Sequence, residues 1–62
     1  MKEMYVFSVE ERTPESDTFE TFAIFSSVVK AEKVKDFYEK EYPDNEYQIR
    51  CFTVDDKYFI GG

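Results

Sequence analysis

Carboxylate pairs are the residues whose type and spacing could carry chemistry in this 62-residue sequence. Adjacent acids occur at Glu10-Glu11 and Asp55-Asp56, and Glu39 and Glu41 stand two positions apart. Such pairs can share a proton in acid–base catalysis or hold a divalent cation. The sequence contains no histidine, and the pairs do not have the spacing of a metal site. We therefore expect solvated charge at these positions, with no catalytic residue and no metal or other cofactor.

Cys51 is the single cysteine, so an internal disulfide is excluded. It falls among the apolar positions of an alternating segment, where a thiol behaves as a small buried hydrophobe. No histidine is available to activate it as a nucleophile. A lone cysteine is typical of a reducing compartment. The sequence thus predicts a cytoplasmic protein that is not an enzyme.

The formal charge is −6, and it is unevenly distributed. Residues 30–40 carry four lysines against three acids, so the rest of the chain holds the negative charge. Such a field repels phosphate groups, so we expect no direct nucleic-acid binding and no binding to anionic membranes. Residues 1–5 lack the apolar run of a signal peptide, and no segment approaches the ~20 apolar residues that span a bilayer.

Residues 26–40 form the segment with a sustained helical period, and the other elements must pack on it. Ser26 or Ser27 can cap its first turn, and Pro43 ends it. At 100° per residue, one stripe is apolar and the opposite side is charged. The stripe contains Ala31, Val34, Tyr38 and Tyr42, with Val28 and Phe37 beside it, and the charged side contains Lys33, Asp36 and Lys40.

Three segments alternate as strands do: residues 4–11, 18–25 and 46–54. Residues 12–17, which include Pro14, have the composition of a hairpin loop. The first two strands pair consistently if Val9 faces Phe19, which also sets Phe7 opposite Thr21. Residues 57–60 could return as a short fourth strand or remain an extended tail.

This order predicts one α+β domain, ββαβ, over residues 1–62. A right-handed crossover gives an antiparallel sheet of order 2-1-3, with the helix packed on one face. The covered face is expected to hold Tyr5, Phe7, Val9, Phe19, Ala23, Phe25, Tyr47, Ile49 and Cys51.

The opposite face is half apolar, which is unusual for a sheet face in contact with water. Its expected partner-binding or dimer residues are Met4, Val6, Phe22, Ile24, Arg50 and Phe52. Three alternatives could cover this face: the chain's own Tyr58 and Phe59, a second copy of the chain, or a different protein. We expect a protein partner or a homodimer.

The run Phe25-Ser26-Ser27, followed by Lys30-Ala31-Glu32 and Tyr42-Pro43-Asp44, is similar to segments of small, mostly uncharacterised ββαβ proteins of bacteria and their phages. Proteins of this kind often act by stoichiometric binding. The resemblance implies a phage-derived inhibitor that occupies a host or defence protein. Acidic charge with an aromatic face suits such a non-catalytic protein-binding module.

The C-terminal Gly61-Gly62, after a ββαβ order of elements, resembles the ubiquitin-like sulfur carriers. In that family the terminal glycine is activated as an adenylate and then as a thiocarboxylate. Here the stretch after the helix is shorter than in the family. A sulfur carrier is therefore the alternative function, and a structural subunit of a homo-oligomer is a further one.

Overall fold

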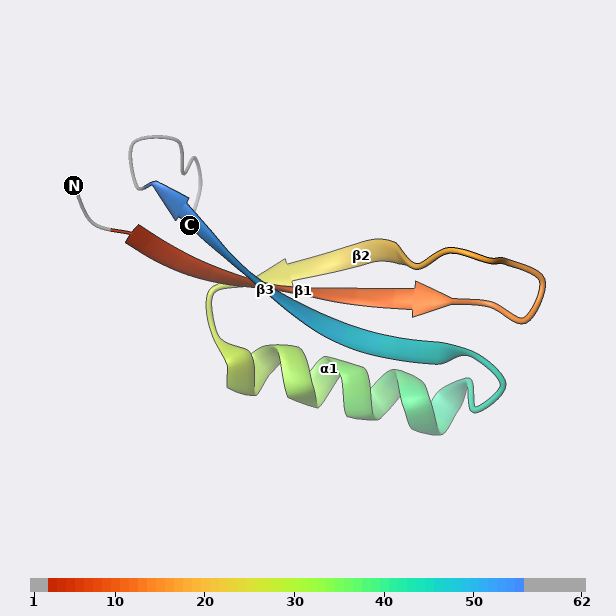
Figure 1. Cartoon of the computed structure of the whole chain (residues 1–62). Coiled ribbons are helices and arrows are strands. Elements are labelled where there is room, and N and C mark those ends of the chain that lie inside the picture. The colour runs from red at the N-terminus through yellow and green to blue at the C-terminus, as the bar shows by residue number, and fades with distance from the viewer. Residues whose placement is uncertain (1–2, 56–62) are drawn as a thin grey trace.

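The order of elements is ββαβ in the computed structural model, which describes residues 3–55 (Figure 1). The elements are β1 (Glu3–Arg12), β2 (Glu20–Phe25), α1 (Val28–Glu41) and β3 (Glu46–Asp55). The strands form one antiparallel sheet in the order β2-β1-β3. The predicted α+β class and the central place of the first strand are confirmed. Residues 57–60, which could have formed a fourth strand, and Gly61-Gly62 lie outside the described residues.

The pairing of β1 with β2 differs from the predicted register by four residues. Val9 lies opposite Ala23 rather than Phe19, and Phe7 lies opposite Phe25. Next to the loop Glu11 lies opposite Glu20 rather than Asp17, so a longer loop accounts for three of the four residues and a bulge for the fourth. In this loop the Ser16 amide donates to the Thr13 carbonyl oxygen at 3.0 Å. The Ser16 hydroxyl also accepts from the amide of Thr18 at 3.2 Å, a local bond that competes with strand pairing. The loop therefore takes up residues 18 and 19, and β2 begins at Glu20.

A β-bulge interrupts the same strand pair. Consecutive residues Val9 and Glu10 lie opposite Ala23 and Thr21, so Phe22 is the extra residue of β2. A bulge shifts alternation by one position, and the residues before it exchange faces. Glu20 and Phe22 therefore lie on the helix side of the sheet and Thr21 on the other, the reverse of the predicted assignment.

The ends of α1 follow from local chemistry. Ser27 is the N-cap, and its hydroxyl accepts a 3.4 Å hydrogen bond from the amide of Lys30. At the other end the Tyr42 amide donates to the Tyr38 carbonyl oxygen, and Pro43 follows. The helix thus begins and ends where the capping serine and the proline predict.

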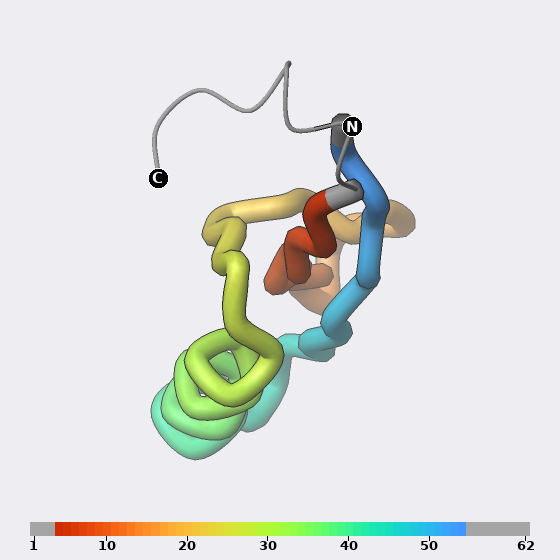
Figure 2. The backbone as a smooth tube through the Cα atoms, turned by 90° about the vertical axis from the view of Figure 1, so that its left-hand side faces the viewer, coloured from red at the N-terminus to blue at the C-terminus, as the bar shows by residue number. Residues whose placement is uncertain are grey.

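The helix covers one face of the sheet, seen end-on in Figure 2. Ala31 and Val9 are both 0% exposed, and they mark the centre of the core. Val34 and Tyr38 are half-buried, while Phe37 and Tyr42 are more than half exposed. The predicted stripe is therefore confirmed at Ala31 and only in part at its margins.

One end of the sheet extends past the helix as a two-stranded ribbon (Figure 1). There, residues 3–6 of β1 pair with residues 52–55 of β3, while β2 reaches only as far as Phe7. Tyr5 is 56% exposed, and Cys51 is exposed as well. The prediction that these two side chains are buried under the helix is wrong, because α1 begins next to Phe7 and runs the other way. In residues 3–55, α1 is too short and too polar to cross a membrane.

Candidate functional site

The candidate site is the sheet face that points away from α1, called here the open sheet face. It follows from the strand registers and the bulge, because residues paired across antiparallel strands share a face. Its residues are Met4, Val6, Ser8, Glu10, Arg12, Thr21, Ile24, Glu46, Gln48, Arg50, Phe52 and Val54.

Five of the six predicted partner-binding residues lie on this face: Met4, Val6, Ile24, Arg50 and Phe52. The placement of the sixth, Phe22, is corrected. The centre of its ring lies 4.9 Å from that of Tyr38 in the helix and 6.1 Å from that of Tyr47 in β3, both on the covered side. The bulge turns Phe22 to that side, and plain alternation along the strand could not reveal it.

The apolar part of the open sheet face combines buried and exposed side chains. Val6 is 8% exposed and Met4 is half-buried. Ile24 of β2 is 62% exposed and Phe52 of β3 is 40% exposed. These fractions are high for large apolar side chains in strands that flank the central strand β1. These two side chains are the part of the face that a docked partner could remove from water.

Glu10 lies at the centre of the face and is only 4% exposed. Gln48 Nε2 donates to Glu10 Oε1 at 2.6 Å, and the Thr21 and Ser8 hydroxyls donate to Oε2 at 3.1 and 3.3 Å. Both carboxylate oxygens are thus bonded to neutral donors. A buried carboxylate needs such partners, because its desolvation would otherwise favour the protonated form.

The hydrogen bond from Gln48 is the largest influence on the pKa of Glu10 and lowers it below the ordinary value of 4.5. Burial acts in the opposite direction, and the bonds from Thr21 and Ser8 and the charge of Arg50 add to the lowering. The net effect is an ionised carboxylate at neutral pH. Since its oxygens are occupied by donors, Glu10 is suited to positioning its neighbours rather than to transferring protons.

Each arginine of the chain lies on the open sheet face and is held by a glutamate and a phenylalanine. Arg50 Nη1 lies 3.7 Å from Glu10 Oε2, and the guanidinium carbon of Arg50 lies 4.8 Å from the centre of the Phe52 ring. Arg12 bonds Glu46 at 2.5 Å, and its guanidinium carbon lies 5.5 Å from the Phe19 ring.

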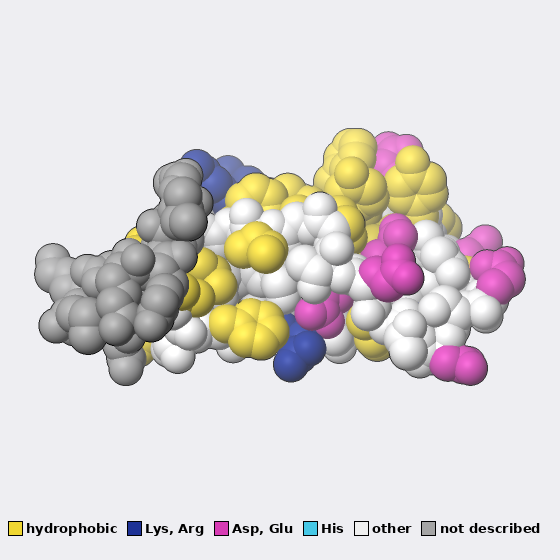
Figure 3. All heavy atoms as spheres, turned by 90° about the horizontal axis from the view of Figure 1, so that it is seen from above, with side chains coloured by type: hydrophobic (Ala, Val, Ile, Leu, Met, Phe, Trp, Pro, Cys, Tyr) yellow, Lys and Arg dark blue, Asp and Glu magenta, His cyan; other side chains and the backbone are white. Residues whose placement is uncertain are grey.

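These two ion pairs make the open sheet face electrically neutral, since its charged residues are two arginines and two glutamates. The whole chain carries −6. Figure 3 views this side of the molecule and shows acidic side chains gathered toward the end with the β1–β2 loop, away from most of the face. The open sheet face is therefore a neutral area on an acidic protein.

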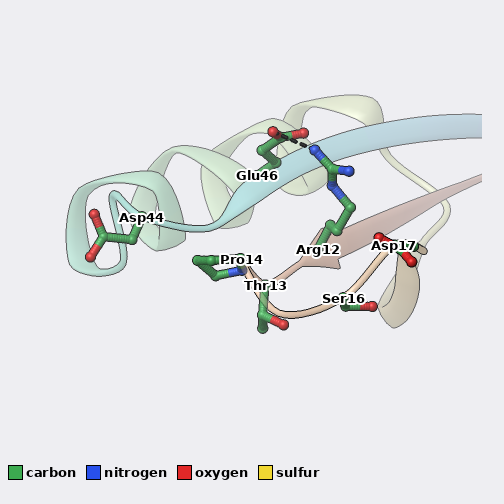
Figure 4. Close-up of a pocket in the computed structure, with 7 residues that line it drawn as sticks. All are labelled: Arg12, Thr13, Pro14, Ser16, Asp17, Asp44 and Glu46. Atoms are coloured by element: carbon green, nitrogen blue, oxygen red, sulfur yellow. Dashed lines mark ion pairs between the residues drawn. The ribbon is translucent and has the colours of Figure 1, made fainter.

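A hollow of about 300 Å³ lies beside the Arg12–Glu46 pair, between the β1–β2 loop and the start of β3. Figure 4 shows Asp17 and Asp44 on opposite sides of it, so their carboxylates do not converge. No group of three or more potential metal-binding side chains occurs within residues 3–55. The hollow has neither the apolar lining nor the converging groups of a ligand site.

The carboxylate pairs considered from the sequence are separated by the fold. Glu10 and Glu11 point to opposite faces of β1, and Glu11 accepts a 2.7 Å hydrogen bond from the Tyr47 hydroxyl. Glu39 forms an ion pair with Lys35 at 3.0 Å on the helix. Asp56 lies outside the described residues.

Sequence reasoning missed an aromatic cluster on the helix side of the sheet. Tyr38 contacts Phe22, Phe37, Tyr42 and Tyr47 at ring distances from 4.9 to 5.9 Å. The available signal was the i,i+4 spacing of Tyr38 and Tyr42, which shows that these two rings are neighbours on the helix. It could not show that Phe22 joins them, because this depends on the bulge.

The comparisons with known proteins add no relative to this description. The chain matches no protein family, and neither a curated protein nor a solved structure is significantly similar to it.

Proposed function

We propose that this chain is a non-catalytic protein-binding module that acts by stoichiometric binding, and that the open sheet face is its docking surface. One observation carries the proposal: Ile24 and Phe52 are exposed on a face that is electrically neutral. Removing large apolar side chains from water is favourable by roughly 25 cal/mol for each Å² buried, and this gain must exceed the entropy lost on association.

The occupant that the charge favours is a second copy of the chain. Two copies at −6 repel each other over most of their surfaces, and the repulsion is smallest where the neutral faces meet. Arg50 is already positioned by Glu10 and Phe52, so less side-chain freedom is lost when the face docks.

The narrower function, a phage-derived inhibitor of a host or defence protein, stays a prediction from the sequence resemblance. The sulfur-carrier alternative depends on Gly62, which lies outside the described residues.

Sedimentation velocity over a series of concentrations, at low and at high salt, tests this proposal. Salt screens the repulsion between two acidic copies, so self-association should strengthen as salt is added. Binding of a basic partner to an acidic surface would weaken instead. A wild-type chain that remains monomeric at every concentration and salt level would contradict docking of a second copy.

Two variants of equal charge locate the surface. Ile24→Glu places a charge on the open sheet face, while Val29→Glu places it at a 57% exposed position of α1. Circular dichroism should show that both variants are folded. We expect Ile24→Glu to abolish self-association and Val29→Glu to retain it; equal loss in the two would show that added charge, rather than the sheet face, is responsible.

A further inference from the structure

A second surface lies on the other side of the molecule, at the margin between α1 and β2. It is formed by the rings of Phe22, Phe37, Tyr38 and Tyr42, and we call it the aromatic flank. Tyr38 is at its centre, 4.9 Å from Phe22, 5.5 Å from Phe37 and 5.9 Å from Tyr42 between ring centres. The four rings are therefore continuous rather than scattered.

Much of the aromatic flank is exposed despite these contacts. Phe37 is 58% exposed, Tyr42 52% and Phe22 40%. Isolated exposed apolar residues are ordinary, but contiguous aromatic surface on a small domain is typical of an interaction site. Aromatic side chains also contribute strongly to the binding free energy of protein interfaces.

The flank rests on a fixed support. Tyr47, 8% exposed, packs under Tyr38 and Phe22, and its hydroxyl donates to Glu11 at 2.7 Å. Asn45 Nδ2 lies 3.4 Å from both the Tyr47 hydroxyl oxygen and the Glu11 carboxylate. A surface whose rings are held in place before binding loses less conformational entropy when a partner docks.

Carboxylates lie next to the rings of the aromatic flank. Glu41 is one helical turn from Phe37, and Glu20 lies on the same side of β2 as Phe22. The C-terminal end of α1, next to Tyr42, carries the negative end of the helix dipole. Lys33 and Lys40 also lie one turn from Phe37, so the charge around this ring is mixed, and the carboxylates of Glu20 and Glu41 are the groups that the flank offers to a basic partner.

The chain itself contains the contact that such a partner would make. Arg50 lies over Phe52 and Arg12 lies over Phe19, at 4.8 and 5.5 Å from the ring centres. Arginine stacks on aromatic faces better than lysine, because its guanidinium is planar and weakly hydrated. Exposed rings beside carboxylates offer the same contact to an arginine from another protein.

We propose that the aromatic flank binds a basic segment of a partner protein, with arginine side chains stacked on Phe37 and Tyr42. This surface is separate from the open sheet face. A chain that self-associates through one surface therefore keeps the other available for a different partner.

The test uses a fluorescein-labelled helical peptide that carries arginine and leucine on one face, titrated with the full chain and followed by fluorescence anisotropy. We expect saturable binding that weakens with salt. The same peptide with lysine in place of arginine should bind less tightly, and one with glutamate should not bind. Absence of saturable binding by the arginine peptide, or equal binding by the lysine peptide, would overturn the proposal.

Matched variants separate the flank from general charge attraction. Phe37→Ala and Tyr42→Ala should each weaken binding about tenfold or more, as loss of an aromatic anchor does. Tyr5→Ala removes a ring that is 56% exposed at the other end of the sheet and should leave binding unchanged. Equal affinity of the Phe37→Ala and Tyr5→Ala variants would refute a role for the flank. The Ile24→Glu variant should still bind the peptide, so a failure of self-association and a failure at the flank are told apart.

Discussion

The Arg50 guanidinium lies 3.7 Å from the Glu10 carboxylate, across the strands β1 and β3. The two side chains differ sharply in exposure: that of Arg50 is 57% exposed and that of Glu10 is 6% exposed. A buried carboxylate thus anchors an exposed cation on the face that we propose for docking. Variants of Glu10, and of Tyr47, Ser27 and Val9, should have measurable effects on stability.

The variant Glu10→Gln should change the acid limb of the stability profile. A carboxylate whose pKa is lowered by folding contributes stability above its unfolded pKa, near 4.5, and that contribution is lost as the pH falls through the lower folded value. The wild type should therefore lose the stability contributed by Glu10 as the pH falls below about 4.5. The variant has no carboxylate at this position and should not show this loss. Urea unfolding midpoints across the acid range measure the difference. The variant Glu32→Gln, at an exposed helical position, should keep the wild-type acid profile.

Tyr47→Phe should change the alkaline limb instead. Burial raises the pKa of Tyr47 above 10.0, the ordinary value, so the unfolded state loses its proton first as the pH rises. The stability linked to the neutral hydroxyl is complete below pH 10.0 and is lost above it. The variant has no such proton to lose and should show a shallower decline. If Tyr5→Phe, on an exposed ring, flattened the profile equally, the effect would not arise from Tyr47.

Ser27→Ala should destabilise the fold by about 1 kcal/mol, because the hydroxyl that accepts from the Lys30 amide is removed. The neighbouring variant Ser26→Ala provides the control. Ser26 is exposed and precedes the cap, so its loss should have little effect. Thermal unfolding of both variants measures the difference. A larger loss of stability in Ser26→Ala would show that Ser26, rather than Ser27, is the N-cap.

Val9→Ala should cost roughly 1 to 3 kcal/mol, since it removes two methyl groups from the fully buried centre of the core. Val29→Ala makes the same truncation at a position that is 57% exposed. It should be close to neutral, because alanine also favours the helix slightly. Chemical unfolding of the pair gives the comparison, and similar losses would contradict the position of the core.

Local sequence patterns were sufficient to predict the helix, the strands and the order of the strands in the sheet. The helix can be predicted from the period of Ala31, Val34 and Tyr38, and its ends from the serines and Pro43, because capping and proline effects act within a few residues. The alternation of β1 and β3 identifies their two faces. The handedness of the crossover then places β1 in the centre. Each of these steps depends on short-range geometry that the sequence displays directly.

The bulge at Phe22 is different, because nothing in the alternation of β2 marks it. A bulge breaks one step of the strand pairing, and here Phe22 reaches the rings of Tyr38 and Tyr47, while Thr21 reaches the Glu10 carboxylate. These partners come from three other elements. Only the assembled structure decides that Phe22 belongs to the aromatic flank rather than to the open sheet face.

The register of β2 had the widest consequences. In the predicted register Phe25 would lie opposite Glu3, and a helix starting two residues later would cover Tyr5. In the structure Phe25 lies opposite Phe7, so α1 starts near the middle of β1. A helix of 14 residues is about 21 Å long, whereas a strand of ten residues spans about 33 Å, so one end of the sheet must extend past it. The sequence alone determined that alternation places Cys51 on the helix side; the tertiary pairing, through the length of one loop and the bulge at Phe22, decided that the helix does not reach it.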